Sequence, residues 1–152
     1  MRWDEIDLTV LAERAVVATL VHVGVPKGAE VAVLAADDAR ISALNAEFRG
    51  KPQPTNVLSW PREERGTATP GDRPDLPPEN QELGDLALAY DTCAREADAA
   101  QIPLAHHATH LIVHGTLHLL GYDHEGDSDG DLMEATETAI LSGLGVPDPY
   151  SR

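Results

Sequence analysis

Three histidines in the last third of the chain stand at the spacing of a metal site: His114, His118 and His124. On a helix, His114 and His118 project from the same face, with their Cα atoms about 6 Å apart along the axis. Two imidazoles at that separation can converge on one Zn²⁺. Gly121 can take the left-handed conformation that ends a helix, so the chain can turn back and bring in His124. Three protein ligands leave a fourth position for water, which is typical of a catalytic zinc site with one ion per chain.

The histidine-rich segment also offers another choice of ligand. Six of the seven histidines lie between residues 106 and 124, and His110 comes four residues before His114. However, His110 and His118 would lie about 12 Å apart on a straight helix, too far to share one ion. Only the pair of His114 and His118 leaves a glycine placed for the turn to His124. We therefore expect His110 to orient a ligand or to pack against the site.

The histidine spacing matches the zinc-protease pattern H-E-x-x-H-x-x-G-x-x-H at every position except one. Where that pattern has the glutamate that acts as general base, this chain has Gly115. The ligand spacing is present and the base of the proteases is absent, so peptide hydrolysis is the weaker expectation. It stays open because a carboxylate from elsewhere in the chain could take that role.

Size and composition favour one cytoplasmic domain. A chain of 152 residues can bury a single core, and we expect residues 1–152 to form one domain. No secretory signal is visible at the start, and the longest apolar stretch, residues 15–25, is too short to span a bilayer, so we expect no membrane association. The single cysteine, Cys93, cannot form an internal disulfide, which fits a reducing cytosol, and we expect it to be a small buried residue.

The net charge of −15 does not by itself point to a nucleic-acid partner, because such proteins usually carry a basic patch. The distribution of charge weakens this objection. Six of the eleven basic residues lie between positions 40 and 73, whereas the segment after Gly121 has eight acids and one arginine. The acidity is therefore concentrated away from the most basic part of the chain.

Local sequence patterns predict helices and strands that build a mixed structure. Helices are expected at residues 7–23, 39–48, 92–100, 103–120 and 131–142, and strands at 30–34, 57–60 and 84–89. Residues 61–81 are rich in Pro, Gly and charge, and we expect either a mobile flap near the site or a disordered segment. The fold class follows as α+β: a small mixed β-sheet flanked by helices, zinc-hydrolase-like, with a long histidine-bearing helix.

Two details of these helices can be checked directly. Asp38 is expected to cap the helix at residues 39–48. In the last helix, Leu132, Ala135, Ala139 and Ile140 are expected to face the core.

Two further segments join the histidines: residues 44–60, which include Arg49-Gly-Lys51-Pro-Gln-Pro-Thr-Asn-Val-Leu-Ser-Trp, and Leu83-Gly84-Asp85. Together they make the chain, from about residue 30 to 144, closely resemble the YbeY family of bacterial rRNA maturation factors. The resemblance implies a zinc-dependent, single-strand-specific endoribonuclease that acts on the 3′ end of 16S rRNA and in ribosome quality control. It also implies that His114, His118 and His124 bind the zinc.

The same resemblance implies a catalytic role for Arg49. The expected mechanism uses a zinc-activated water, with the planar guanidinium of Arg49 holding the scissile phosphate. The expected partners are single-stranded RNA or rRNA, together with a ribosomal protein or a ribosome-associated GTPase that would recruit this acidic chain. Two alternatives stay open: a zinc metallopeptidase, and a non-catalytic ribosome assembly factor whose zinc is structural.

Three further side chains near these motifs each have more than one expected role. Asp123 is expected to orient a histidine, to take a proton or to cap the turn. Trp60 and Tyr122 can stack on an unpaired base, but core packing is the stronger expectation for both.

Overall fold

The computed structural model describes residues 3–4, 6–49, 55–63, 65, 69, 71–123 and 126–150, with side chains omitted at positions 48 and 49. The elements in chain order are α1 (Leu8–Val23), β1 (Glu30–Ala36), α2 (Asp38–Arg49), β2 (Val57–Pro61), β3 (Glu82–Ala89), α3 (Tyr90–Ala100), α4 (Leu104–Leu119) and α5 (Asp127–Gly143). The strands form one sheet in the order β1-β3-β2, in which β1 is parallel and β2 antiparallel to β3. The expected α+β class with a small mixed sheet is confirmed.

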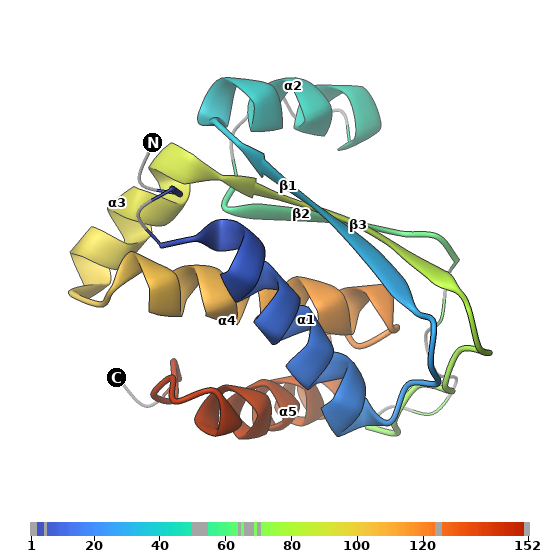
Figure 1. Ribbon diagram of the computed structural model, residues 1–152. Coiled ribbons are helices and arrows are strands. Elements are labelled where there is room, and N and C mark those ends of the chain that lie inside the picture. Colours follow the sequence, from blue (N-terminus) through green and yellow to red (C-terminus); the bar gives the residue numbers. More distant parts are fainter. Residues whose placement is uncertain are drawn as a thin grey trace.

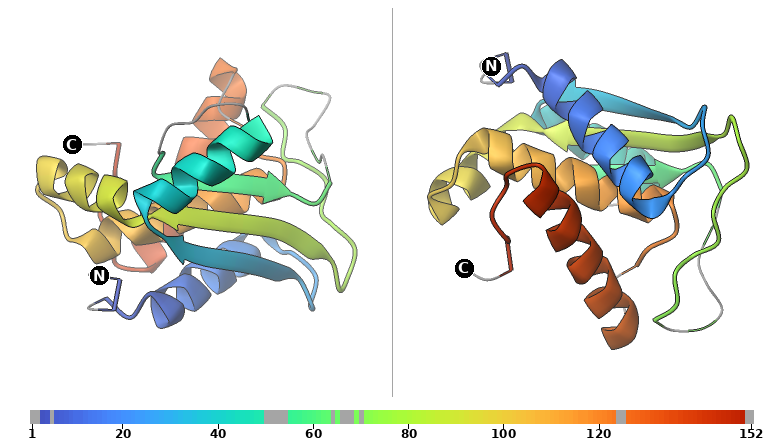
Figure 2. Two further views of the ribbon diagram at one scale, coloured as in Figure 1. Left: turned by 90° about the horizontal axis from the view of Figure 1, so that it is seen from above. Right: turned by 60° about the horizontal axis from the view of Figure 1, so that its bottom comes forward.

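The helices cover both faces of this sheet (Figure 1). Helix α2 lies on one face, α1 and α4 lie on the other, and α5 packs on the far side of α4. The view from above in Figure 2 shows α2 lying over the strands. Helix α4 is therefore the central element, because it contacts the sheet on one side and α5 on the other.

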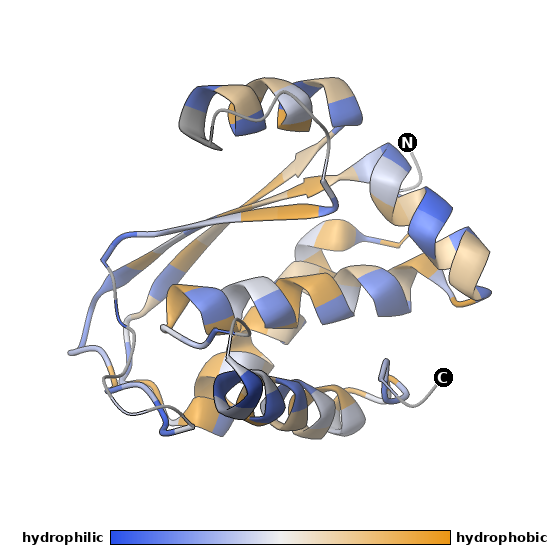
Figure 3. Cartoon of the chain, turned by 180° about the vertical axis from the view of Figure 1, so that it is seen from behind, coloured by the Kyte–Doolittle hydropathy of each residue, from blue (hydrophilic) through white to orange (hydrophobic). Residues whose placement is uncertain are grey.

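The main core lies between the sheet and the α1–α4 layer. Its fully buried members include Leu86 and Leu88 of β3 and Ile112 and Leu117 of α4. Figure 3 shows hydrophobic residues running along the strands and along α4. A smaller cluster on the opposite face of the sheet packs Ile41 of α2 against Leu58 of β2. Burial of large apolar side chains on both faces stabilises the sheet by roughly 1.5–3 kcal/mol for each one.

The start of α2 differs from expectation in one residue. The backbone N–H of Arg40 donates to Asp37 Oδ1 at 2.8 Å, so Asp37 caps this helix and the prediction for Asp38 was wrong. Asp38 instead accepts hydrogen bonds from the backbone N–H and the hydroxyl of Thr92, at 3.0 and 2.9 Å. It thereby ties α2 to the first turn of α3.

Cys93 is fully buried, as expected. Burial, with the nearby charges of Glu96 and Asp38, raises the pKa of its thiol to about 12. The thiol is therefore held neutral, in keeping with a packing role.

In the part of the chain that the structure describes, no helix combines the length and the apolar character needed to cross a bilayer.

Gly115 explains why α4 can approach the sheet so closely. A Cβ atom at this position would lie 2.7 Å from Cδ2 of Leu86, a side chain that is only 1% exposed. No real Cβ contact is that short, so any larger residue requires Leu86 to move within a packed core.

We expect Gly115→Ala to lower the free energy of unfolding by about 1 kcal/mol, although alanine is intrinsically the better helix former. Gly143→Ala, in α5, is the matched control because a Cβ there meets no atom within 4 Å. The free energies of unfolding of the two variants, measured by denaturant titration, test this prediction. An increase in stability for Gly115→Ala would mean that Leu86 adapts freely and that close packing does not require this glycine.

Candidate metal centre

The two helical histidines meet as their spacing predicts. Nε2 of His114 and Nε2 of His118 lie 3.0 Å apart on one face of α4, and both side chains are partly exposed. Two ligands of one tetrahedral zinc lie about 3.3 Å apart, given Zn–N distances of roughly 2.0–2.1 Å. The pair is therefore arranged much as two ligands of a single ion would be.

The opposite nitrogen of each ring is held by an acceptor. Nδ1 of His118 lies 2.9 Å from the carbonyl oxygen of Tyr122, and Nδ1 of His114 is in direct hydrogen-bond contact with Oε1 of Glu137. A carbonyl or an ionised carboxylate can only accept, so both rings carry their proton on Nδ1. With Nδ1 protonated in both rings, either a proton shared by the two Nε2 atoms or a metal cation bound to both satisfies the pair.

The buried Glu137 carboxylate holds His114 of the histidine pair in place through its hydrogen bond. Its side chain is fully buried, and its second oxygen, Oε2, contacts the hydroxyl of Tyr150 and lies 3.3 Å from Nε2 of His110. Burial alone raises the pKa of this carboxyl, but the hydrogen bonds from His110, His114 and Tyr150 and the electrostatic interaction with His114 outweigh it and lower the pKa to about 2. Glu137 is therefore ionised at neutral pH and accepts from all three side chains.

Glu137 was not foreseen from the sequence. The expectation for α5 is confirmed for Ile140, which is buried, and for Leu132, which packs against the core, but it was wrong for two alanines. Ala135 and Ala139 are exposed, and the buried residues are Met133, Thr136, Glu137, Ile140 and Leu141. One acidic residue at helical spacing among large apolar ones was the available signal. Such a residue is rarely buried without a partner, and here the partners are two histidines and a tyrosine.

His110, His114 and Glu137 form a group that could itself hold a metal ion, since one ligand atom of each lies within 4.8 Å of the others. This group shares His114 with the pair formed by His114 and His118. The expectation that His110 packs against the site or orients a ligand agrees with its contact to Glu137. Because the carboxylate already accepts hydrogen bonds from both histidines, the group is satisfied without an ion.

The turn after α4 is built as the sequence predicts. Helix α4 ends at Leu119, and Gly121 has a φ of +102°, in the left-handed region. A Cβ at Gly121 would lie 2.2 Å from the carbonyl oxygen of Arg65, so the position also requires glycine on steric grounds. His124 and the side chain of Arg49 lie outside the described part of the chain, and their roles remain predictions.

A cavity of about 880 Å³ opens beside the histidine pair. Its lining comes from β2, α4, the turn after α4, α5 and the chain end, and includes Thr55, Ser59, Trp60, His110, His114, His118, Tyr122, Asp123 and Tyr150. Tyr122 is 4% exposed and belongs to the main core, which confirms the packing role expected for it. The volume lies within the range of small-molecule sites, roughly 300–1,000 Å³.

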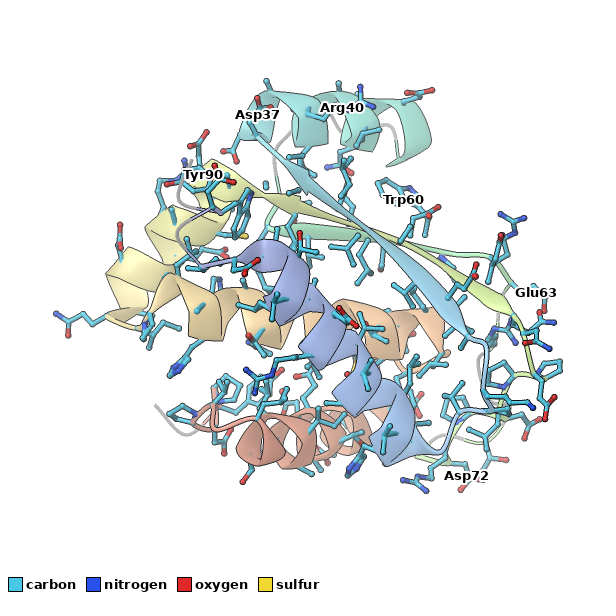
Figure 4. The ribbon with its side chains drawn as sticks, viewed as in Figure 1. Asp37, Arg40, Trp60, Glu63, Asp72 and Tyr90 are labelled. Atoms are coloured by element: carbon cyan, nitrogen blue, oxygen red, sulfur yellow. The ribbon has the colours of Figure 1, made fainter. Side chains whose placement is uncertain are left out.

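The segment after β2 contributes one wall of this cavity, through Glu63, Arg65 and Asp72 among others. Figure 4 labels Trp60, Glu63 and Asp72, which follow one another from the sheet down the side of the molecule. The backbone N–H of Gly71 donates to Asp129 Oδ1 at 2.7 Å, which fastens the segment to the first turn of α5 (Figure 2, right). Five described residues of this segment therefore lie at the cavity, namely Pro61, Glu63, Arg65, Asp72 and Pro74, and the mobility of the segment stays a prediction.

Comparison with known proteins yields a consistent result. A family model described as "Endoribonuclease YbeY" matches residues 2–145. A protein named Endoribonuclease YbeY from Dinoroseobacter shibae is 61% identical over 153 residues, covering 97% of this chain and 84% of the relative. Its namesake from Jannaschia sp. is 59% identical over 149 residues, covering 97% and 93%.

One solved structure shares the fold. A Thermotoga maritima protein, determined in solution, aligns over 100% of this chain and 95% of its own length, with a TM-score of 0.56 and 20% sequence identity.

Proposed function

This chain belongs to the YbeY endoribonuclease family, and from that premise we propose that it cleaves single-stranded RNA with the help of a zinc ion held by His114, His118 and His124. The observation that carries the metal assignment is the facing pair of Nε2 atoms at 3.0 Å. In each ring, a hydrogen bond from Nδ1 to an acceptor fixes the ring orientation, as is usual for a metal-binding histidine.

The protein's own residues would divide the work as follows. His114 and His118 offer neutral Nε2 atoms from a rigid, buried helix, and Glu137 and the Tyr122 carbonyl fix their orientation. A bound zinc would supply Lewis-acid activation of water and of the phosphate. Arg49 is proposed to hold the scissile phosphate, because a guanidinium can donate two parallel hydrogen bonds and stabilise the added charge.

We further propose that the substrate is rRNA in the cytoplasm, with the 3′ end of 16S rRNA as the cleaved region and ribosome quality control as the wider role. Recruitment by a ribosomal protein or a ribosome-associated GTPase would bring this acidic chain, with its net charge of −15, to a polyanion.

A peptidase is the competing enzyme class, and the structure weakens it. A glutamate at position 115, where the zinc proteases have their general base, does not fit, because a Cβ alone would lie 2.7 Å from Cδ2 of Leu86. A peptidase would need a carboxylate from elsewhere in the chain for that role. A protein with only a structural zinc is the non-enzymatic alternative, and it needs a fourth protein ligand to close the water position.

One assay separates these three possibilities. Purified protein is incubated with a single-stranded RNA and with casein side by side, with and without a metal chelator. We expect chelator-sensitive loss of the RNA and intact casein. Loss of casein alone would favour the peptidase, and a zinc-loaded protein inert toward both substrates would favour the structural alternative.

A further inference from the structure

Arg65 lines the cavity beside the histidine pair, and no sequence motif marks it. Its side chain is only 9% exposed. Within the described part of the chain, its Nε and Nη2 atoms are buried and have no hydrogen-bond partner. Among the described residues, it forms an ion pair with Glu63, whose Oε2 lies 3.6 Å from Nη2 and whose side chain is 64% exposed. A long ion pair with one exposed partner contributes little, so the buried guanidinium lacks a full partner.

The position of Arg65 is set by the same turn that follows the histidine helix. The backbone oxygen of Arg65 would lie 2.2 Å, and its own Cβ 3.0 Å, from a Cβ placed at Gly121. Gly121 comes three residues after His118, so the root of the Arg65 side chain is packed directly against the end of the candidate metal centre. The guanidinium is thereby held at the cavity wall.

The charges around the cavity give this arginine a specific task. Among the described residues, Arg65 is the only lysine or arginine in the lining, whereas Glu63, Asp72, Asp123 and Asp129 are acids. A phosphodiester strand that enters such a cavity is repelled by the carboxylates. It needs a cation there to bind, and a planar guanidinium with unpaired N–H groups suits a phosphate.

We propose that Arg65 binds a phosphate of the RNA strand inside this cavity, beside the phosphate that is cleaved. The inference rests on the proposed function and adds a substrate-binding residue to it. Arg65 thus compensates locally for the acidity of the chain, and it positions the strand against the histidine helix.

The test is the affinity of a fluorescent single-stranded RNA, measured at several salt concentrations and within a time too short for cleavage. We expect Arg65→Gln to weaken binding about tenfold or more, as the loss of a charge-assisted contact does. The slope of log K against log salt should shrink by about 0.7, the share of one phosphate on a single strand. Arg65→Lys should keep the salt dependence of binding but lose part of the affinity. The positive charge stays, whereas the planar guanidinium, which can donate two parallel hydrogen bonds, is lost.

Arg62→Gln is the matched control, since it removes the same charge three residues away. Arg62 is 67% exposed, pairs with Glu82 at 3.1 Å and does not line the cavity. Equal affinities and slopes for Arg65→Gln and Arg62→Gln would overturn the proposal. If Arg65→Gln does not fold, Arg65→Lys decides, and wild-type affinity in that variant would overturn it.

The same experiment separates this inference from the proposed function. Wild-type protein that binds and cleaves RNA, with Arg65→Gln indistinguishable from the control, refutes only the role of Arg65. Wild-type protein that neither binds nor cleaves the RNA refutes both.

Discussion

His118→Ala is expected to remove bound zinc and RNA cleavage together. The mutation deletes one of two Nε2 atoms that face each other at 3.0 Å, and with it a ligand of the proposed ion. The effect on metal affinity should exceed the roughly 10–100-fold loss that follows removal of a group that only supports a ligand. Cleavage should therefore fall by at least about 100-fold at zinc concentrations that saturate the wild type.

His118 is a better choice than His114 for this experiment. Removal of the His114 ring would also take a hydrogen bond from the buried Glu137 carboxylate and would lower stability. His22→Ala, on the exposed surface of α1, is the matched control. Metal content measured by atomic emission and the rate of RNA cleavage should match the wild type in the control. Full zinc occupancy in His118→Ala would contradict the assignment of this ligand.

Glu137→Gln is expected to have the second-largest effect. The amide keeps the shape of the side chain but loses the charge that accepts hydrogen bonds from His114, His110 and Tyr150. Zinc affinity, measured by competition with a chromogenic chelator, should fall roughly 10–100-fold. The free energy of unfolding of the metal-free protein should also fall, by about 1–3 kcal/mol, because buried polar groups lose their partner.

Two comparisons give this prediction its meaning. Glu134→Gln removes the same charge from the exposed side of α5 and should change neither quantity. Tyr150→Phe removes only one donor to Glu137 and should lower zinc affinity less than Glu137→Gln does. If Glu137→Gln lost stability but bound zinc as tightly as the wild type, Glu137 would be a structural residue with no role in orienting His114.

Much of the fold could be predicted because it depends on local patterns. Apolar residues at helical spacing and Gly24, at φ +85°, mark α1, and the pairing of His114 with His118 follows from helix geometry alone. The left-handed turn at Gly121 was likewise predictable, because few other residues adopt it.

The residues that the sequence did not reveal act through tertiary contacts. Glu137 meets His114 across 23 positions, and Tyr150 reaches His110 across 40, so no local spacing connects them. Arg65 lies in a segment without periodicity, and only the fold places it against the turn at Gly121. Ala135 and Ala139 were wrongly expected to face the core for the same reason. The buried face of α5 contains a charged residue, Glu137, so the sequence pattern does not show it as an apolar face.

The most direct test of the account is the zinc content of the purified protein and its cleavage of single-stranded RNA, measured on one preparation before metal removal, after it, and after zinc is returned. We predict about one zinc per chain, as a three-histidine catalytic site implies, with cleavage lost on removal and restored by one equivalent. Cleavage that persists at full strength in protein stripped of metal would contradict the account at its centre.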